Sequence, residues 1–206
     1  SNHARVLTGL PDVDLVGVAD PDMKQADFVA RTLGCTAVGS VDELLDLKVD
    51  AVTIAAPTHL HHDIALRCIA RGIHVLVEKP IASTVEEGRD IIAAARRAGV
   101  TLMVGHVERF NPAVETIKEA LRNENILSVA ITRVGPFPPR MSNVGVVIDL
   151  AVHDIDLIRW FTDSEIIEVQ PQLSSAVAER EDIALLQFRT ASGVLAHINT
   201  NWLTPF

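Results

Sequence analysis

An acid, a base and a proline stand in a row at Glu78, Lys79 and Pro80, and these residues are the best placed for chemistry in this sequence. They follow four apolar residues, Ile73 and Val75 to Val77, which predict a buried strand at residues 73–77. In a parallel α/β sheet, ligands bind at the carboxyl ends of the strands, so Lys79 is placed to handle a substrate proton. A solvated lysine at a strand end fits the same pattern. Because Pro80 rigidifies a sharp turn, we expect the bond between Lys79 and Pro80 to be cis.

A second candidate pair, Asp149 and His153, lies in a segment with the apolar spacing of a helix, residues 147–161. On an α-helix, side chains four residues apart share one face, one turn apart. A carboxylate beside an imidazole can orient the ring and support its protonated form. A pair on the helix surface with no chemical role fits the same spacing. Asp154 and Asp156 fall on other faces, where we expect solvated or capping carboxylates.

Asp20 closes a predicted strand, residues 15–19. In a dinucleotide-binding domain, an acid at this place accepts hydrogen bonds from the adenosine ribose and disfavours a 2′-phosphate. Such an acid therefore favours NAD over NADP. An aspartate that caps a helix or a turn before Pro21 is the alternative interpretation.

Three histidines, His59, His61 and His62, follow another predicted strand, residues 51–56. Their clustering suggests a metal ion, but metal sites need ligands that converge, and no acid or cysteine has a matching spacing. We therefore expect no metal site. His61 either lines a crevice or is a solvated residue at the start of a helix.

The composition limits the classes of function. The 206 residues suffice for one large domain, or for one domain and part of another. A net charge of −9 argues against nucleic acid and anionic membrane surfaces as partners. No apolar run approaches the ~20 residues that span a bilayer, and no secretory signal opens the chain. Two cysteines, Cys35 and Cys68, do not make a disulfide framework, which favours a cytoplasmic location.

The first half of the chain alternates between strands and helices. Beside the strands already named, residues 101–104 predict a strand, and helices are expected at residues 22–33, 62–71 and 84–98. The spacing of Thr84 and Glu87 predicts a capping box at the start of the last helix. Continuous apolar strands that alternate with helices are typical of a parallel sheet covered on both faces.

The pattern changes after Gly105. One helix, residues 112–122, precedes strand-like runs at residues 127–134, 166–169, 183–188 and 194–200. The helix at residues 147–161 interrupts these runs, and strands that otherwise follow one another without helices favour a largely antiparallel, open sheet and hence an α+β domain. We therefore assign residues 1–106 to a dinucleotide-binding domain and residues 107–206 to a substrate and oligomerisation domain. We expect a strongly apolar open face of this sheet, which would need cover and so favours a homo-oligomer.

At each end of the sequence we expect a domain that is only partly included. A dinucleotide-binding domain normally opens with a strand and a glycine-rich turn, which places the pyrophosphate at a helix N-terminus. Residues 3–10 match the tail of that first helix, and no such strand or turn precedes them. We therefore expect a domain without its first strand and glycine loop. Residues 202–206 end within the second domain, which we expect to be incomplete.

Together these features resemble the glucose–fructose oxidoreductase/inositol dehydrogenase (Gfo/Idh/MocA) family. The resemblance implies a Rossmann-type domain that binds NAD or NADP, an open mixed sheet, and oxidation or reduction of a sugar or polyol carbon. It rests on motifs spread over the chain: Asp20, the pattern of Pro57, His61 and Ala65, Glu78-Lys79-Pro80, Gly105-His106 with Arg109-Phe110, and Asp149 with His153.

The same resemblance implies roles for individual residues. Lys79, Asp149 and His153 form the catalytic set. His153 acts as the general base that Asp149 orients, and Lys79 binds the reacting oxygen, although Lys79 as the base remains open. NAD is preferred to NADP, and the implied cofactor contacts come from Asp20, Pro57, Thr58, His61, Glu78 and Lys79.

Finer motifs, at residues 105–112, 135–140 and 201–205, are similar to the UDP-N-acetylglucosamine 3-dehydrogenase branch of that family. This similarity implies hydride transfer between C3 of that sugar nucleotide and the nicotinamide. An inositol or free-sugar dehydrogenase is the alternative enzyme. A non-catalytic sensor or structural paralogue with the same fold is the alternative outside enzymes.

Overall fold

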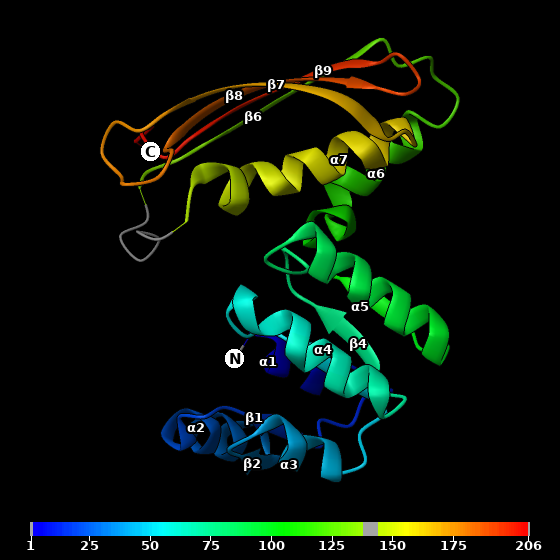
Figure 1. Ribbon diagram of the computed structural model, residues 1–206, viewed down its shortest axis with the longest axis vertical. Coiled ribbons are helices and arrows are strands. Elements are labelled where there is room, and N and C mark those ends of the chain that lie inside the picture. The colour runs from blue at the N-terminus through cyan, green and yellow to red at the C-terminus, as the bar shows by residue number, and fades with distance from the viewer. Residues whose placement is uncertain (1, 138–143, 206) are drawn as a thin grey trace. The chain divides into compact units, whose positions relative to one another are not determined.

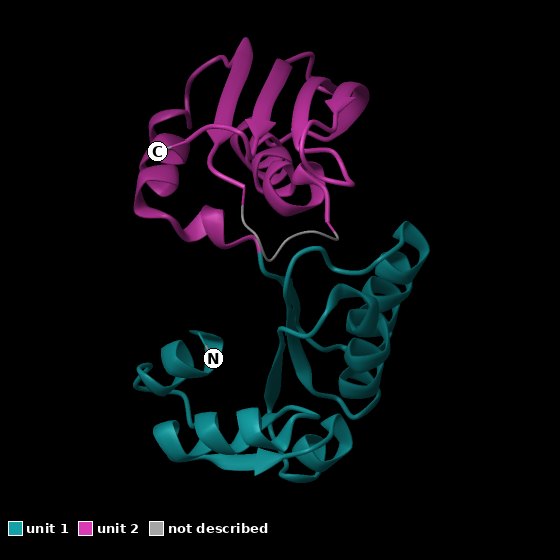
Figure 2. Ribbon diagram, turned by 90° about the vertical axis from the view of Figure 1, so that its left-hand side faces the viewer, with its two compact units in different colours: residues 1–105 teal, residues 106–206 magenta. Residues whose placement is uncertain are grey.

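The protein is described by a computed structural model that covers residues 2–137 and 144–205. The chain divides into two compact units, Ser1–Gly105 and His106–Phe206, and each unit is described by itself (Figure 2). Of the motif at residues 135–140, positions 138–140 lie outside the described residues.

Unit 1 is built on parallel strands, as expected. One sheet pairs β1 (Gly17–Ala19) with β2 (Thr36–Val38), and the other has the order β3 (Ala51–Ile54), β4 (His74–Val77) and β5 (Leu102–Val104). The usual order of strands in a dinucleotide-binding sheet is 3-2-1-4-5-6. The two sheets correspond to strands 3-2 and 4-5-6 of this Rossmann order, in which strand 1 lies between them.

The helix α1 (Asn2–Thr8) precedes β1, and the strands of unit 1 are connected by α2 (Met23–Leu33), α3 (Val41–Asp46), α4 (His61–Ala70) and α5 (Val85–Ala98) (Figure 1). The buried side chains of α4 and α5 join those of β3 and β4 in one hydrophobic core. Within residues 2–137 and 144–205, no helix is long and apolar enough to cross a membrane.

Local chemistry sets the helix ends. The Thr84 hydroxyl accepts from the Glu87 N–H while the Glu87 carboxylate accepts from the Thr84 N–H, so the predicted capping box is confirmed. The helices α2 and α5 end at Gly34 (φ 75°) and Gly99 (φ 68°), a left-handed conformation that glycine adopts without steric cost.

Two elements of unit 1 are absent from the sequence-based expectations. The strand β2, Thr36–Val38, does not lie in a continuous apolar run, and α3 has only six residues, too few to display a clear helical period. β2 exists because it pairs along the whole length of β1. The Ser40 hydroxyl accepts from the Glu43 N–H at the start of α3.

Unit 2 holds one four-stranded sheet in the order β6 (Ser128–Val134), β9 (Leu195–Asn201), β8 (Ile183–Thr190) and β7 (Ile166–Ser174). β6 pairs with β9 in parallel, and the other two pairings are antiparallel, so the sheet is mixed but largely antiparallel. The helix α7 (Val152–Thr162) runs along one face of this sheet (Figure 1). A second helix, α6 (Pro112–Ala120), precedes the strands.

The segment that carries Asp149 and His153 differs from the expected single α-helix. It opens with a π-helical stretch, η3 (Val147–Ala151), and becomes α-helical only at α7. In a π-helix, hydrogen bonds reach from i to i+5, so residues four apart are separated by less than a full turn. Both side chains are half-buried.

The sheet face turned away from α7 is more polar than expected. Alternation along the strands points Leu186 and Phe188 of β8 toward the core, and Gln187, His197 and Asn199 occupy the opposite face. Leu185 and Leu195 are exposed apolar residues on that face. The expectation of a strongly apolar open face is therefore wrong.

A buried carboxylate closes the connection between β7 and β8. Asp182 is 0% exposed, and its oxygens accept hydrogen bonds from the N–H groups of Ala176, Val177 and Ala178 at 2.6–3.0 Å. Burial raises the pKa of Asp182, but the hydrogen bonds from these N–H groups together lower it by more. The pKa of Asp182 therefore lies below its ordinary value. The charged carboxylate therefore stabilises this turn.

We expect Asp182→Ala to lower the free energy of unfolding by about 1–3 kcal/mol at pH 7, since three N–H groups lose their acceptor. The stabilising term is complete above the unfolded pKa of about 3.9 and disappears as pH falls through the lower folded pKa, so parent and variant should converge in acid. Urea unfolding followed by fluorescence measures this, because both tryptophans lie in unit 2. Glu179→Ala, an exposed acid in the same turn, is the control. A constant difference from pH 7 to pH 2 would contradict the argument.

Candidate active site

The backbone at the carboxyl end of β4 is held from both neighbouring strands. The Glu78 N–H donates to the Ile54 carbonyl of β3 at 2.9 Å, and the Gly105 N–H, just after β5, donates to the Val77 carbonyl at 2.7 Å. Lys79 follows directly and is half-buried. The bond between Lys79 and Pro80 is cis, which confirms the expectation.

The Glu78 carboxylate is fixed by two donors. His3 of α1 donates from Nε2 to Oε1 at 2.7 Å, and the Lys79 N–H donates to Oε2 at 3.1 Å. Burial raises the pKa of Glu78, but these two donors together lower it by more. The pKa of Glu78 therefore lies below its ordinary value. Glu78 is therefore held as an anion beside the lysine. No pattern in the sequence marks His3 as a partner of Glu78, because the two residues lie 75 positions apart.

Gly105 allows the close approach of this segment to β5. A Cβ atom there would lie 2.9 Å from Oε2 of Glu78, 3.2 Å from the Lys79 nitrogen and 3.3 Å from the Glu78 Cα. The last two are backbone atoms that cannot rotate away. A side chain at this position would therefore have to displace the Glu78–Lys79 backbone by a few tenths of an ångström.

His61 is a buried residue, 1% exposed, at the first position of α4. Its Nδ1 lies 2.9 Å from the Pro80 carbonyl oxygen and its Nε2 lies 2.8 Å from the Ala56 carbonyl oxygen. The interpretation of His61 as a solvated residue at a helix start is therefore wrong. Both ring nitrogens face main-chain carbonyls rather than an open crevice.

The other two histidines of the cluster point elsewhere. The His62 Nε2 lies 2.9 Å from Oδ2 of Asp90 on α5, and His59 is exposed. The three rings therefore meet three different environments. Across the described part of the chain, no group of three or more histidine, cysteine or acidic residues could hold a metal ion.

The remaining predicted cofactor residues lie in loops after parallel strands. Asp20 follows β1, and its Oδ1 accepts from the Asp22 N–H at 2.9 Å in a turn, while Asp22 itself caps α2. Pro57 precedes the short helix η1 (Thr58–Leu60) that follows β3, and Thr58 is half-buried. The turn role considered for Asp20 is thus present and uses one carboxylate oxygen.

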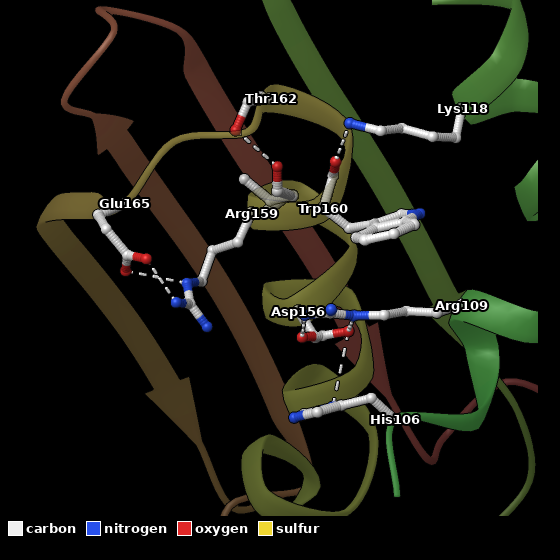
Figure 3. A network of polar contacts seen from close by, with 9 residues as sticks. His106, Arg109, Lys118, Asp156, Arg159, Trp160, Thr162 and Glu165 are labelled. Carbon is white, nitrogen blue, oxygen red and sulfur yellow. Dashed lines mark hydrogen bonds and ion pairs between the residues drawn. The ribbon is translucent and has the colours of Figure 1, made fainter. Parts of the chain in front are cut away.

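In unit 2, the helix that carries Asp149 and His153 also carries a buried ion pair. Asp156 is 3% exposed, and Arg109 donates to it from Nε at 2.7 Å and Nη2 at 2.5 Å (Figure 3). The His106 Nδ1 lies 3.6 Å from the same carboxylate. The expectation of a solvated or capping Asp156 is wrong, because an arginine distant in sequence neutralises it.

The network continues along α7 (Figure 3). The Arg109 guanidinium lies 4.7 Å from the centre of the Trp160 ring, and Lys118 of α6 donates to the Trp160 carbonyl at 2.6 Å. Asp154 is 0% exposed and bound by Arg133 of β6 at 2.8 Å, so it too is neither solvated nor a cap. Charged contacts thus fasten α7 to the first residues of unit 2, to α6 and to the sheet.

The structure gathers the predicted site residues within each unit. In unit 1, Glu78, Lys79 and His61 meet around the end of β4, and Pro57 and Thr58 follow the adjacent strand. In unit 2, the proposed acid–histidine pair lies on one helical segment. The structure adds four residues to these regions: His3, Gly105, His106 and Arg109. The last three belong to the sequence motif at residues 105–110, whereas no motif contains His3.

Comparison with family models covers both units. Residues 1–106 match the model described as "Oxidoreductase family, NAD-binding Rossmann fold", and residues 126–206 match the "GFO/IDH/MocA C-terminal domain". The assignment of the fold to a Rossmann-type domain followed by an α+β domain agrees with both models.

Individual relatives are enzymes by name. The UDP-N-acetylglucosamine 3-dehydrogenase of Acidithiobacillus ferrooxidans is 34% identical over 89% of this chain and 58% of its own length, and its solved structure superposes with a TM-score of 0.92 at 32% identity over 98% of this chain and 66% of that one. The inositol 2-dehydrogenase of Rubrobacter xylanophilus is 33% identical over 99% of this chain and 60% of its own. GenD2 from gentamicin A biosynthesis, solved with NAD, has a TM-score of 0.91 at 29% identity over 99% of this chain and 63% of that one. The chain thus spans about three fifths of the length of these curated relatives.

We expect Gly105→Ala to lower the free energy of unfolding by about 1–3 kcal/mol, because the added methyl group overpacks against the Glu78–Lys79 backbone. Thermal unfolding followed by circular dichroism measures the change. Gly135→Ala is a matched control, since a Cβ atom at Gly135 meets nothing within 4 Å. Equal stability of the two variants would show that the segment after β4 can shift at no cost.

Proposed function

Because the chain belongs to the Gfo/Idh/MocA family of NAD-binding oxidoreductases, we propose that it functions as an NAD-dependent dehydrogenase on a CH–OH group of a sugar or sugar nucleotide. The observation that carries this proposal is the place of Lys79, directly after a parallel strand that is bonded on both sides. Open α/β sheets bind their ligands at such strand ends.

The residues of unit 1 fit a bound NAD at the end of β1. A carboxylate offers about four acceptor positions, and the Asp22 N–H uses one of those on Asp20. The remaining positions suit the hydroxyls of an adenosine ribose, and the negative charge repels a 2′-phosphate. We propose that Asp20 selects NAD over NADP, and that Pro57, Thr58 and Glu78 border the same cofactor.

The chain's own residues manage the hydroxyl group and its proton. The nicotinamide, when bound, accepts or supplies the hydride. We assign His153 as the general base and Asp149 as the carboxylate that orients it. Lys79 binds the reacting oxygen and stabilises negative charge on it. The opposite assignment, with Lys79 as the base, predicts that Lys79→Arg abolishes turnover while His153→Ala only weakens it.

UDP-N-acetylglucosamine, oxidised at C3, is the substrate proposed first. It is supported by the 34% identity to the Acidithiobacillus enzyme and by the motifs at residues 105–112 and 201–205. Inositol is the second candidate, because a relative named inositol 2-dehydrogenase matches 99% of the chain at 33% identity. The two candidate substrates differ in charge. The diphosphate of the sugar nucleotide is anionic and needs cationic partners, whereas inositol is uncharged and does not.

We also propose that the protein is a cytoplasmic homo-oligomer that associates through the open face of the unit 2 sheet. This association is supported by the low net charge of the face. Glu168 and Arg189 form an ion pair there, and Leu185 and Leu195 add apolar area. A face of this composition is more readily buried against a second copy than a densely charged one.

Replacing Asp20 by alanine removes the charge that repels a 2′-phosphate. We expect Asp20→Ala to bind NADP at least about tenfold more tightly than the parent, which corresponds to about 1.4 kcal/mol, and to bind NAD more weakly. Calorimetric titration of both cofactors into both proteins tests this. Asp14→Ala, an exposed acid outside the turn, should match the parent. A parent that prefers NADP would rule out the proposed selection.

Replacing either catalytic candidate should stop the chemistry and spare the cofactor. We expect Lys79→Ala and His153→Ala each to lower kcat by about 10²–10⁴-fold, the usual contribution of a positioned acid or base, with NAD affinity largely kept. Reduced nicotinamide is followed by absorbance with UDP-N-acetylglucosamine, then with inositol and free hexoses. His59→Ala and His62→Ala serve as controls and should keep parental turnover. The proposed site is wrong if Lys79→Ala and His153→Ala both keep parental turnover as well.

A further inference from the structure

The residue after the proposed catalytic lysine is held by a buried ring. We propose that His61 is a positioning residue, which fixes Lys79 through its contact with the Pro80 carbonyl and does not touch the cofactor. This inference rests on the role proposed for Lys79. It assigns the two ring nitrogens of His61 different tasks, one toward the lysine and one toward the loop after β3.

The burial of His61 makes it a rigid support. It is the first of four buried side chains of α4, together with Ala65, Cys68 and Ile69, and these follow the spacing of one helix face. This face packs in the core of unit 1 beside β3 and β4. The ring is therefore packed into unit 1 together with the buried face of α4.

The chemistry of the two partners defines what the ring must do. The Pro80 and Ala56 partners are carbonyl oxygens, which only accept hydrogen bonds. A ring nitrogen that satisfies either of them must donate. A neutral imidazole has one N–H and serves one carbonyl, and an imidazolium serves both. In either form Nδ1 can carry an N–H toward the Pro80 carbonyl, and we assign one there because a buried carbonyl without a donor is unfavourable.

The contact with Pro80 completes a clamp around Lys79. On the amino side, the Glu78 N–H is bonded to the Ile54 carbonyl and the Glu78 carboxylate to His3. On the carboxyl side, the proline ring fixes φ and His61 holds the carbonyl. Loss of the Nδ1 contact would therefore release only one side of the lysine backbone. The Nε2 contact holds Ala56 and the loop after β3 instead.

This division of tasks can be separated by amide side chains. The amide nitrogen of asparagine can occupy the place of Nδ1, and that of glutamine the place of Nε2. His61→Asn therefore keeps the donor toward Pro80, His61→Gln keeps the donor toward Ala56, and His61→Leu keeps neither. A purely structural histidine would make activity follow stability in all three variants.

We expect kcat to fall about 10–100-fold in His61→Leu and His61→Gln, since a displacement near 1 Å of a catalytic group has effects of this size. His61→Asn should stay within about threefold of the parent. The dissociation constant for NAD and the KM for the sugar should change little in all three. The control is His59→Asn, an exposed histidine in the preceding turn, which should match the parent.

A readout without substrate accompanies the kinetics. The rate at which Lys79 is acetylated by acetic anhydride, followed by peptide mass spectrometry, reports its surroundings. That rate should change in His61→Gln and His61→Leu and stay at the parental value in His61→Asn. Melting temperatures of all variants show whether the loss merely follows stability.

The outcomes separate this inference from the proposed function. Lys79→Ala is measured in the same series: if it keeps parental turnover, the function assigned to Lys79 fails. If Lys79→Ala is inactive but His61→Leu keeps parental kcat and labelling, the positioning role alone fails. It also fails if His61→Gln retains activity and His61→Asn loses it, or if kcat and labelling in the three variants simply follow their melting temperatures.

Discussion

The proposed chemistry depends on one constraint, which is that the backbone at the carboxyl end of β4 is bonded to both neighbouring strands. These bonds involve the Glu78 and Gly105 N–H groups and lie inside a parallel sheet. A lysine carries about 2 kcal/mol of rotamer entropy in its long stem, so a fixed Cα is the first condition for its amine to meet one oxygen repeatedly. The close packing at Gly105 shows how little space that arrangement leaves.

Unit 2 fixes its helix with buried charge. Asp154 and Asp156 lie on α7, and each binds an arginine from another element, Arg133 of β6 and Arg109 of η2 (Val107–Phe110). Removing one partner of a buried ion pair leaves an uncompensated charge and costs about 3–5 kcal/mol, so each aspartate and its arginine are required together. The helix segment that presents the proposed base is thereby tied to the sheet and to the first turn of the unit.

Much of the fold could be predicted because its signals are local. Helix ends depend on residues three or four positions apart, such as Thr84 with Glu87, or on a single glycine such as Gly34. The continuous apolar runs that contain β1, β3 and β4 likewise predict a parallel sheet. The three residues of β2 lie outside such a run and form a strand because they pair with β1. The π-helical start of the segment with Asp149 has no counterpart in the apolar spacing either.

The types of side chain and their positions along each strand or helix, including Lys79 after its strand, can be read from the amino-acid sequence alone. What those side chains contact depends on how distant segments pack together. His61 was compatible with solvent until a carbonyl from residue 80 and another from residue 56 enclosed its ring. Asp156 was a surface acid on its own helix until Arg109, 47 residues away, neutralised it. The physical reason is that burial and hydrogen bonding are set by partners distant in the chain, about which the periodicity of one element contains no information.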